Sequence, residues 1–365
     1  MAEVAAIRVL IVDDSSVVRR LLAELVGSAP DMQVVGTAPD GKIALAKLDQ
    51  TNPDLVTLDV EMPEMNGLET LAAIRQRRPH LPVIMVSSLT RPAAAATLDA
   101  LSLGANDYVN KPAAASGRSE GLAQLRDDLL TKIRLFVRGK TALPPPPEPA
   151  AVAPLRKERV RSTVAAVAIG VSTGGPNALQ ELVPTLGLDL PVPVLIVQHM
   201  PPTFTKLLAD RLAKLRGGAV EEAVAGMTVE PGCVYIAPGD HHMVIERREG
   251  RVEILLNKEP PENSCRPAVD PLFRSVAATY GARALGVVLT GMGNDGGVGC
   301  EHLHDHGAQI LIQDEASSVV WGMPGLVARK GLADGVLPLK ELGPEIRRRV
   351  LEGRVARRAS LGGRS

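Results

Sequence analysis

Three polar residues in the second half of the sequence, Ser172, His199 and Asp295, have the types that nucleophilic acyl chemistry requires. Ser172 lies in AVAIGVSTGGPNALQ, as the serine of a G-x-S-x-G pattern between an apolar run and an expected helix. A sharp strand-to-helix turn exposes such a serine, and the free N–H groups of the helix stabilise negative charge beside it. The pattern equally describes a phosphate cradle or a serine that caps the helix, so three interpretations stay open.

His199 ends the apolar run VLIVQH, which is the next expected strand after the one before Ser172. Consecutive strands are neighbours in a sheet in roughly two-thirds of cases, so a hydrogen bond between His199 and Ser172 is geometrically reasonable. An imidazole near its ordinary pKa can take the serine proton at neutral pH. His241 and His242 lie in a Gly/Pro-rich turn and are weaker alternatives.

Asp295 lies in the stretch LTGMGNDGGVG, whose glycines from Gly291 to Gly296 match the G-x-G-x-x-G spacing of a dinucleotide site. An aspartate inside that loop would repel a pyrophosphate, and the following GVGCEHLHDHG is short and polar, unlike the helix that such a site needs. We expect instead that Asp295, exposed on the loop, orients His199 and stabilises its cation. The backbone N–H of Met292 is a candidate donor to a developing oxyanion.

A second set of reactive side chains lies in the first half of the sequence. Asp13 and Asp14 follow the first apolar run, Asp59 ends the third, and Lys111 follows the fifth. In a doubly wound sheet these positions meet at one edge, where neighbouring carboxylates call for a hard cation such as Mg²⁺. One carboxylate can then attack a phosphoryl donor and form an aspartyl phosphate, with Lys111 and the hydroxyl of Ser87 beside its oxygens.

The elements that position these groups alternate regularly in the first half. Its apolar runs are 7–12, 32–36, 54–60, 82–88 and 106–110. Its segments of helical period are about 15–28, 41–50, 66–78, 92–103 and 119–138. Five such βα repeats predict a doubly wound parallel sheet.

The second half is expected to be another doubly wound α/β domain, with an antiparallel β insertion in its middle. Its apolar runs are 164–171, 192–199, 233–237, 252–256, 284–290 and 308–314. The stretch TALPPPPEPAAVAPLRKERVR favours an extended spacer between the halves because its four consecutive prolines forbid a helix. The expected divisions are a first domain at 1–138, a Pro-rich linker at 139–161, a second domain at 162–353 and a basic flexible tail at 354–365.

Composition restricts the classes of partner. The chain has 41 Lys plus Arg and 41 Asp plus Glu, with only 3 Phe, 3 Tyr and 1 Trp, so neither a basic field nor a base-stacking surface indicates nucleic acid. The 3 cysteines are far apart and form no C-x-x-C pair, which is typical of reduced thiols. The start lacks the features of a signal peptide, and no apolar run approaches the roughly 20 residues that span a bilayer. We therefore expect a cytoplasmic protein without membrane insertion.

The first half resembles the response-regulator receiver domain across residues 6–138, through VDDSS, LDVEMPEMNG, VSS and NKP. The resemblance implies a flavodoxin-like fold that takes a phosphoryl group from a histidine kinase onto Asp59. It also implies these further roles: Mg²⁺ ligation by Asp13, Asp14, Asp59 and the carbonyl of Glu61, and switching by Ser87, Tyr108 and Lys111.

The second half resembles the catalytic domain of the chemotaxis protein-glutamate methylesterase family, through IGVSTGGP, QHMP, CRPAVDPLFRS, LTGMGNDGG and QDEASSVVWGMPG. The resemblance implies Ser172 as nucleophile, His199 as general base and Asp295 as the orienting carboxylate, with no metal for this chemistry. It implies γ-glutamyl methyl esters of methyl-accepting chemotaxis receptors as substrates, an acyl-enzyme and release of methanol. The same chemistry on glutamine would release ammonia.

Phosphorylation and hydrolysis can be coupled by access to the active site. Guided by the family, we expect the unphosphorylated receiver to restrict access to Ser172, and a phosphate on Asp59 to favour an open arrangement. Two alternatives from other classes are a second domain that binds a dinucleotide through Gly291–Gly296, and a regulator without enzymatic activity that acts through protein or DNA contacts.

Overall fold

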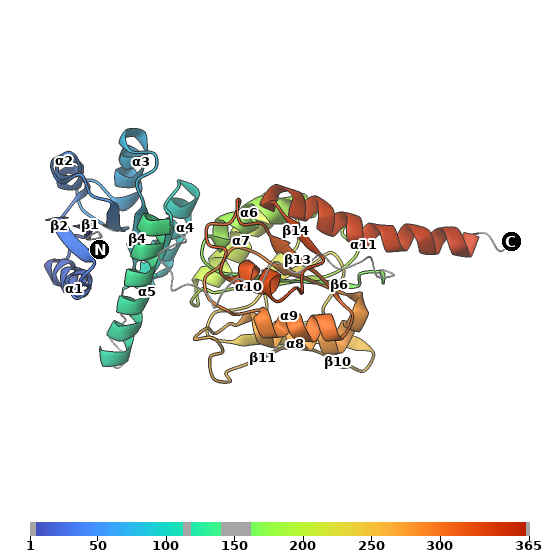
Figure 1. Ribbon diagram of the computed structural model, residues 1–365. Coiled ribbons are helices and arrows are strands. Elements are labelled where there is room, and N and C mark those ends of the chain that lie inside the picture. Colours follow the sequence, from blue (N-terminus) through green and yellow to red (C-terminus); the bar gives the residue numbers. More distant parts are fainter. Residues whose placement is uncertain (1–4, 112–117, 140–161, 363–365) are drawn as a thin grey trace. The chain divides into compact units, whose positions relative to one another are not determined.

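The structure is a computed structural model that describes residues 5–111, 118–139 and 162–362. The chain divides into two compact units, Met1–Pro146 and Pro147–Ser365 (Figure 1). Both units are α/β with a parallel sheet, which confirms the predicted fold class. The expected Pro-rich linker at 139–161 lies, from residue 140 onward, outside the described residues.

The first unit has a five-stranded parallel sheet in the order β2-β1-β3-β4-β5, the flavodoxin-like arrangement. Its strands are β1 (Ile7–Val12), β2 (Met32–Ala38), β3 (Leu55–Asp59), β4 (Val83–Ser87) and β5 (Asp107–Asn110). The intervening helices are α1 (Ser16–Gly27), α2 (Gly41–Thr51), α3 (Gly67–Arg77), α4 (Arg91–Ser102) and α5 (Arg118–Arg138). These bounds agree with the predicted segments to within a few residues.

Capping side chains start four of these helices, α1, α2, α3 and α4. Ser15 accepts the N–H of Val18 at the start of α1. Asn66 accepts the N–H of Glu69, whose side chain in turn accepts the N–H of Asn66, which makes a capping box for α3. Because the residues of β3 and β4 are all buried, the polar groups of this unit gather at the strand ends.

The second unit has a seven-stranded parallel sheet in the order β14-β13-β12-β6-β7-β9-β8, and a separate antiparallel pair, β10-β11. Its strands are β6 (Ala166–Val171), β7 (Val194–Gln198), β8 (Val220–Glu222), β9 (Val234–Ile236), β10 (His242–Arg248), β11 (Arg251–Asn257), β12 (Ala284–Val288), β13 (Gln309–Gln313) and β14 (Gly335–Leu337). Its α-helices are α6 (Gly175–Thr185), α7 (Phe204–Arg216), α8 (Val269–Tyr280), α9 (Gly297–Asp305), α10 (Met323–Arg329) and α11 (Leu339–Gly362).

Helices cover both faces of this sheet. In Figure 1, α6, α7 and α11 lie on one face, and α8 and α9 lie on the other. The core on the side of α8 joins Phe273 to Ala168 of β6, Val288 of β12 and Leu303 of α9. From β6 the chain adds its next strand, β7, on one side, whereas from β12 it adds β13 on the opposite side. The order in which strands are added therefore reverses between β6 and β12. Ligands bind at such switch points in open α/β sheets.

The structure corrects two expectations for the second unit. The predicted antiparallel insertion is confirmed, but it pairs β11 with β10, whereas the run at 233–237 forms β9 in the parallel sheet. The segment GVGCEHLHDHG contains a helix, α9, that the polar sequence did not indicate. Helix α11 extends to Gly362 through helix-favouring Arg, Ala and Leu, and the flexibility of the basic tail at 354–365 stays a prediction. Within the described residues, every helix lacks the combination of length and apolar character needed to cross a bilayer.

Candidate active site

Three neighbouring strands bring Ser172, His199 and Asp295 to one edge of the sheet. Ser172 directly follows β6 and His199 directly follows β7, its neighbour in the sheet. Asp295 lies in the loop between β12 and α9, and β12 pairs with the other side of β6. The structure therefore brings these three side chains together at the carboxyl ends of adjacent strands, as predicted, and it does so at the switch point of the sheet.

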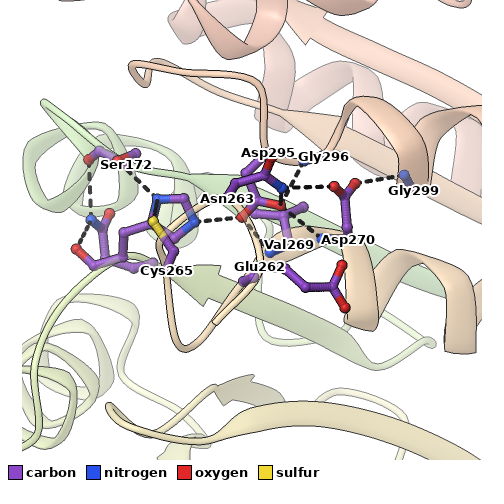
Figure 2. A network of polar contacts seen from close by, with 12 residues as sticks. Ser172, Glu262, Asn263, Cys265, Val269, Asp270, Asp295, Gly296 and Gly299 are labelled. Carbon is purple, nitrogen blue, oxygen red and sulfur yellow. Dashed lines mark hydrogen bonds and ion pairs between the residues drawn. The ribbon is translucent and has the colours of Figure 1, made fainter. Parts of the chain in front are cut away.

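His199 contacts both of the other side chains, Ser172 and Asp295, which are labelled in Figure 2. Its Nδ1 lies 3.1 Å from Oγ of Ser172, and its Nε2 lies 2.7 Å from Oδ2 of Asp295. A carboxylate only accepts hydrogen bonds, so Asp295 requires the imidazole proton on Nε2. Nδ1 then carries a lone pair that accepts the hydroxyl proton of Ser172. The arrangement is that of a nucleophile, a base and a group that orients the base.

Asp295 is buried, which corrects the expectation that it is exposed on its loop; only 2% of its surface is accessible. Its Oδ2 accepts the N–H of Val269 (2.6 Å) in addition to His199. Its Oδ1 accepts the N–H groups of Gly296 (2.9 Å) and Asp270 (3.1 Å). The start of α8 covers the loop, so the carboxylate is held by backbone donors that the glycine motif could not reveal.

The pKa of Asp295 lies below its ordinary value, and the pKa of His199 lies above its ordinary value. Burial alone would raise the pKa of Asp295, but the hydrogen bond and charge of His199, with the N–H groups of Val269 and Asp270, hold it below its ordinary value. Burial alone would lower the pKa of His199, but the hydrogen bond to Asp295 and the nearby thiol of Cys265 raise it. Asp295 therefore makes His199 a stronger proton acceptor.

Ser172 occupies the turn between β6 and α6 without capping the helix. The cap position of α6 is Gly174, with φ of 77°, and the helix starts without a side-chain cap. The interpretation of Ser172 as a helix cap is therefore wrong. The N–H of Ser172 donates to the carbonyl of Thr290 (3.0 Å), and its own carbonyl accepts the N–H of Gly175 (2.8 Å). The hydroxyl remains directed at His199, beside the N-terminal end of α6.

The glycine-rich loop passes directly against the serine. A Cβ added to Gly291 would lie 2.9 Å from Cβ of Ser172, so a larger residue there would displace the nucleophile. Met292 follows Gly291 and is therefore close to the serine, while the role of its N–H toward an oxyanion stays a prediction. Because a helix does follow the loop, the lack of a helix no longer argues against a dinucleotide site. The remaining argument is Asp295, whose carboxylate is hydrogen-bonded to His199 and to the start of α8.

Two residues that sequence reasoning missed also contact the site. Gln198 donates through Nε2 to the carbonyls of Ser172 (3.1 Å) and His199 (3.2 Å), and so ties the two turns together. Sγ of Cys265 lies 3.4 Å from Nδ1 of His199, the same atom that faces Ser172. Both lie in stretches that carried the family resemblance, QHMP and CRPAVDPLFRS, which was the available signal.

The other histidines considered from the sequence have structural contacts. His242 is buried, with Nε2 3.1 Å from the carbonyl of Pro260 and Nδ1 accepting the N–H of Ala268 (3.2 Å). Nδ1 of His241 lies 3.2 Å from the carbonyl of Gly239. His199 is thus the histidine that the structure brings to Ser172.

The first unit gathers the predicted acidic residues at its own switch point, between β1 and β3. Asp13, Asp14 and Asp59 each offer a carboxylate oxygen, and these oxygens lie within 4.8 Å of one another. Nζ of Lys111 lies 2.9 Å from Oδ2 of Asp13 and 2.8 Å from Oδ2 of Asp59. The N–H of Glu61 donates to Oδ1 of Asp59 (3.4 Å), so its backbone lies at the cluster too. Oxygen donors alone form a set that suits Mg²⁺.

Burial dominates the protonation of Asp59. Only 3% of its surface is accessible, and burial together with the charge of Asp13 raises its pKa to about 6, although the hydrogen bond from Lys111 opposes the rise. The hydroxyl of Ser87 is engaged away from Asp59, donating to the carbonyl of Ser88 and accepting from Thr97 (2.8 Å).

Tyr108 is buried in β5, and its carbonyl accepts a hydrogen bond from Lys132 (2.6 Å). Burial raises the pKa of its phenol well above the ordinary value, so it stays protonated near neutral pH. The predicted switching roles of Ser87, Tyr108 and Lys111 stay predictions.

Both units are similar to known protein families. Residues 167–346 match the family described as CheB methylesterase, and residues 9–118 match the response regulator receiver domain. A protein-glutamate methylesterase/protein-glutamine glutaminase of Trichodesmium erythraeum is 50% identical over 351 residues, covering 94% of this chain and 99% of that protein. A protein of the same description from a Nocardioides species is 47% identical over 355 residues, covering 95% and 96%.

A solved structure is similar to the second unit. The crystal structure of the CheB methylesterase catalytic domain of Thermotoga maritima has 41% sequence identity and a TM-score of 0.50, and covers 51% of this chain and 98% of that domain. The similarity therefore extends through the whole of that catalytic domain.

Proposed function

The chain belongs to the protein-glutamate methylesterase/protein-glutamine glutaminase family, and from this premise we propose that Ser172, His199 and Asp295 perform its hydrolysis. The substrates are γ-glutamyl methyl esters, and glutamine side chains, of methyl-accepting chemotaxis receptors. The observation that carries the proposal is the position of His199, whose two ring nitrogens lie 3.1 Å from the hydroxyl of Ser172 and 2.7 Å from the carboxylate of Asp295.

The geometry supports a two-step reaction. Oγ of Ser172 attacks the ester carbonyl carbon while Nδ1 of His199 takes its proton, and Asp295 stabilises the resulting imidazolium. His199 returns that proton to the departing methoxide, so methanol leaves and an acyl-serine remains. Water, activated by the same nitrogen, then releases glutamate and regenerates the serine. With glutamine, the leaving group is ammonia.

Two features favour the charge that develops on the carbonyl oxygen. The uncapped N-terminal end of α6 follows Ser172, and its N–H groups carry partial positive charge. The N–H of Met292 belongs to the loop that packs against the serine and is the second proposed donor.

The test of this proposal is a product assay with the full chain. The protein is incubated with receptor carrying labelled methyl esters, and released methanol is measured alongside ammonia from receptor glutamines. We expect both products. Absence of methanol with every receptor ester offered, from protein that is folded, would contradict the proposal.

We propose further that the first unit controls this activity by accepting a phosphoryl group on Asp59 from a histidine kinase. Asp13, Asp14, Asp59 and the carbonyl of Glu61 would hold Mg²⁺, which neutralises the charge of the incoming phosphoryl group. Lys111, already paired with Asp13 and Asp59, would contact the phosphate once it forms. The unmodified receiver restricts access of the receptor to Ser172, and phosphorylation shifts the population toward an accessible state.

Replacing Asp59 with asparagine is expected to abolish activation by a small phosphodonor such as acetyl phosphate, because the amide is a far poorer nucleophile than the carboxylate. Methanol release is measured with and without the phosphodonor in Mg²⁺. Asp49→Asn is the matched control, since the side chain of Asp49 is 61% exposed. Retained activation in Asp59→Asn would move the phosphorylation site to another residue.

Occlusion by the receiver predicts a faster isolated hydrolase. A fragment of residues 158–365 is expected to release methanol faster than the unphosphorylated full chain, because nothing then restricts access to Ser172. The rates are compared at equal concentration on the same receptor. Equal rates would refute occlusion and leave the hydrolysis itself untouched.

A further inference from the structure

A second buried carboxylate lies beside Asp295, and one amide connects the two. Asp270 at the start of α8 is 2% exposed, and its Oδ1 accepts the N–H of Gly299 (2.6 Å). Nδ2 of Asn263 lies 3.0 Å from Oδ2 of Asp270 and 3.1 Å from Oδ1 of Asp295. Dashed lines in Figure 2 mark these contacts. An amide nitrogen has two protons, so Asn263 can donate one to each carboxylate.

The backbone around Asn263 is fixed in an uncommon conformation. Asn263 and Ser264 have φ of 51° and 62°, and Glu262 and Cys265 exchange backbone hydrogen bonds of 3.1 and 2.9 Å across them. Two successive left-handed residues define a tight turn in which asparagine is among the few favoured side chains. Arg274 of α8 binds both carboxylate oxygens of Glu262 (2.8 and 2.5 Å), which pins the turn to the helix. The amide is thus aimed by a rigid support.

A residue that connects the two carboxylates disturbs their charges least if it is itself neutral. Burial, together with the negative charge of Asp295, raises the pKa of Asp270 to about 6, despite the N–H of Gly299. A cation at position 263 would neutralise Asp295 and weaken its effect on His199, whereas a third carboxylate would add to the repulsion. An asparagine supplies a donor to each carboxylate and adds no charge.

We propose that Asn263 is a positioning residue for the hydrolysis, one that holds Asp295 against Nε2 of His199 and keeps Asp270 and Asp295 together. This inference rests on the proposed function of Ser172 and His199 and extends it to a residue that touches none of the reacting atoms. Asn263 itself is exposed, so its side chain contributes to the site from the surface rather than from the core.

The charged and titratable groups that surround the pair come from every segment packed against it. They are His199 after β7, Glu262 and Cys265 of the turn, Asp270 and Arg274 of α8, and Cys300 of α9. Of these, His199 alone bonds both Asp295 and the nucleophile, so a change at position 263 reaches the reaction through His199.

The test replaces Asn263 with glycine and with aspartate. Glycine keeps the left-handed turn and removes the amide, while aspartate keeps the size and the turn preference but exchanges the donor for a charge. Ser264→Gly is the matched control, because it changes the neighbouring left-handed residue of the same turn. For each full-length protein, kcat and KM for methanol release are measured across pH, and folding is checked by thermal unfolding.

We expect Asn263→Gly to lower kcat by about 10- to 100-fold with little change in KM, the scale of a misplaced catalytic group. Loss of the donor leaves Asp295 more negative, so His199 holds its proton more tightly and the rise of kcat/KM with pH moves to higher pH. The move is larger in Asn263→Asp. Ser264→Gly is expected to match the wild type in both respects.

Three results would overturn the proposal. The first is that folded Asn263→Gly and Asn263→Asp both keep the wild-type kcat and the wild-type pH dependence. The second is a loss of activity that appears only as a higher KM, with the pH dependence unchanged, and the third is a loss of kcat in Ser264→Gly as large as that in Asn263→Gly. Absence of methanol release by the wild type would instead refute the proposed function, so the two failures are distinguishable.

Discussion

Replacing Ser172 with alanine is expected to lower the rate of methanol release by about 10⁴- to 10⁶-fold, the loss seen when a serine hydrolase loses its nucleophile. Without Oγ, the acyl-enzyme cannot form, and His199 can at most activate water. Helix α6 and the loop containing Met292 remain, so a small residual rate above that in solution is expected. The rate is measured with labelled receptor ester, and covalent labelling of the protein by substrate should disappear with it.

Two comparisons make the result specific. Ser162→Ala removes an exposed hydroxyl from the same unit and is expected to retain the wild-type rate. Cys265→Ala removes the other nucleophilic atom at Nδ1 of His199, 3.4 Å away, and is expected to cost far less than Ser172→Ala. If instead Cys265→Ala abolishes release and Ser172→Ala retains it, the nucleophile is the thiol and the assignment of Ser172 is wrong.

The reactive side chains could be predicted because each lies at the end of an apolar run or in the loop that follows it. Parallel strands end at one edge of a sheet, so the order of runs was enough to expect Ser172, His199 and Asp295 near one another. The same reasoning placed Asp13 and Asp59 together in the first unit, where their oxygens lie within 4.8 Å. Local sequence patterns are enough to predict a site when the fold itself brings the ends of the strands together.

The supporting residues could not be predicted because they reach the site from elsewhere in the chain. Asn263 and Val269 contact Asp295 only because the chain turns back over the loop after β11, and no local pattern encodes that path. Burial of Asp295 follows from the same path. Its polar type alone suggested exposure.

Helix α9 was missed because small residues, not apolar periodicity, pack its first turn. A Cβ on Gly299 would lie 2.5 Å from Cβ of Phe273, and one on Gly297 would lie 2.6 Å from the side chain of Leu326. Glycines therefore let the helix approach its neighbours closely, although they weaken its sequence signal. Strands β8 and β14 are three residues each, too short to show a period.

Replacing Asp295 with asparagine is expected to lower kcat on the order of 10⁴-fold, as the same change does in a serine protease triad. An amide that turns its nitrogen toward Nε2 of His199 donates to it and moves the imidazole proton to Nδ1. That nitrogen then donates toward Ser172 and can no longer accept its proton. The nucleophile and the base remain in place, but the tautomer is wrong.

The substitution also disturbs a buried set of donors. Oδ2 accepts from His199 and Val269, and Oδ1 accepts from Asn263, Asp270 and Gly296. An amide nitrogen in either position faces N–H groups that have lost their acceptor, which costs about 1 to 3 kcal/mol of stability. Thermal unfolding measures this loss separately from the kinetics. Asp305→Asn, whose parent side chain is 75% exposed, is the control.

The pH dependence identifies the cause. Asp295 raises the pKa of His199, and hydrolysis requires the neutral imidazole, so the wild-type rate rises with pH as His199 loses its proton. In Asp295→Asn the pKa of His199 falls, so the remaining activity reaches its plateau at lower pH, although the plateau itself is far lower. This shift is opposite to the one expected for Asn263→Asp, which adds charge beside an intact Asp295. A fall in rate with an unmoved pH profile would mean that Asp295 acts on the fold alone, and not through the proton affinity of His199.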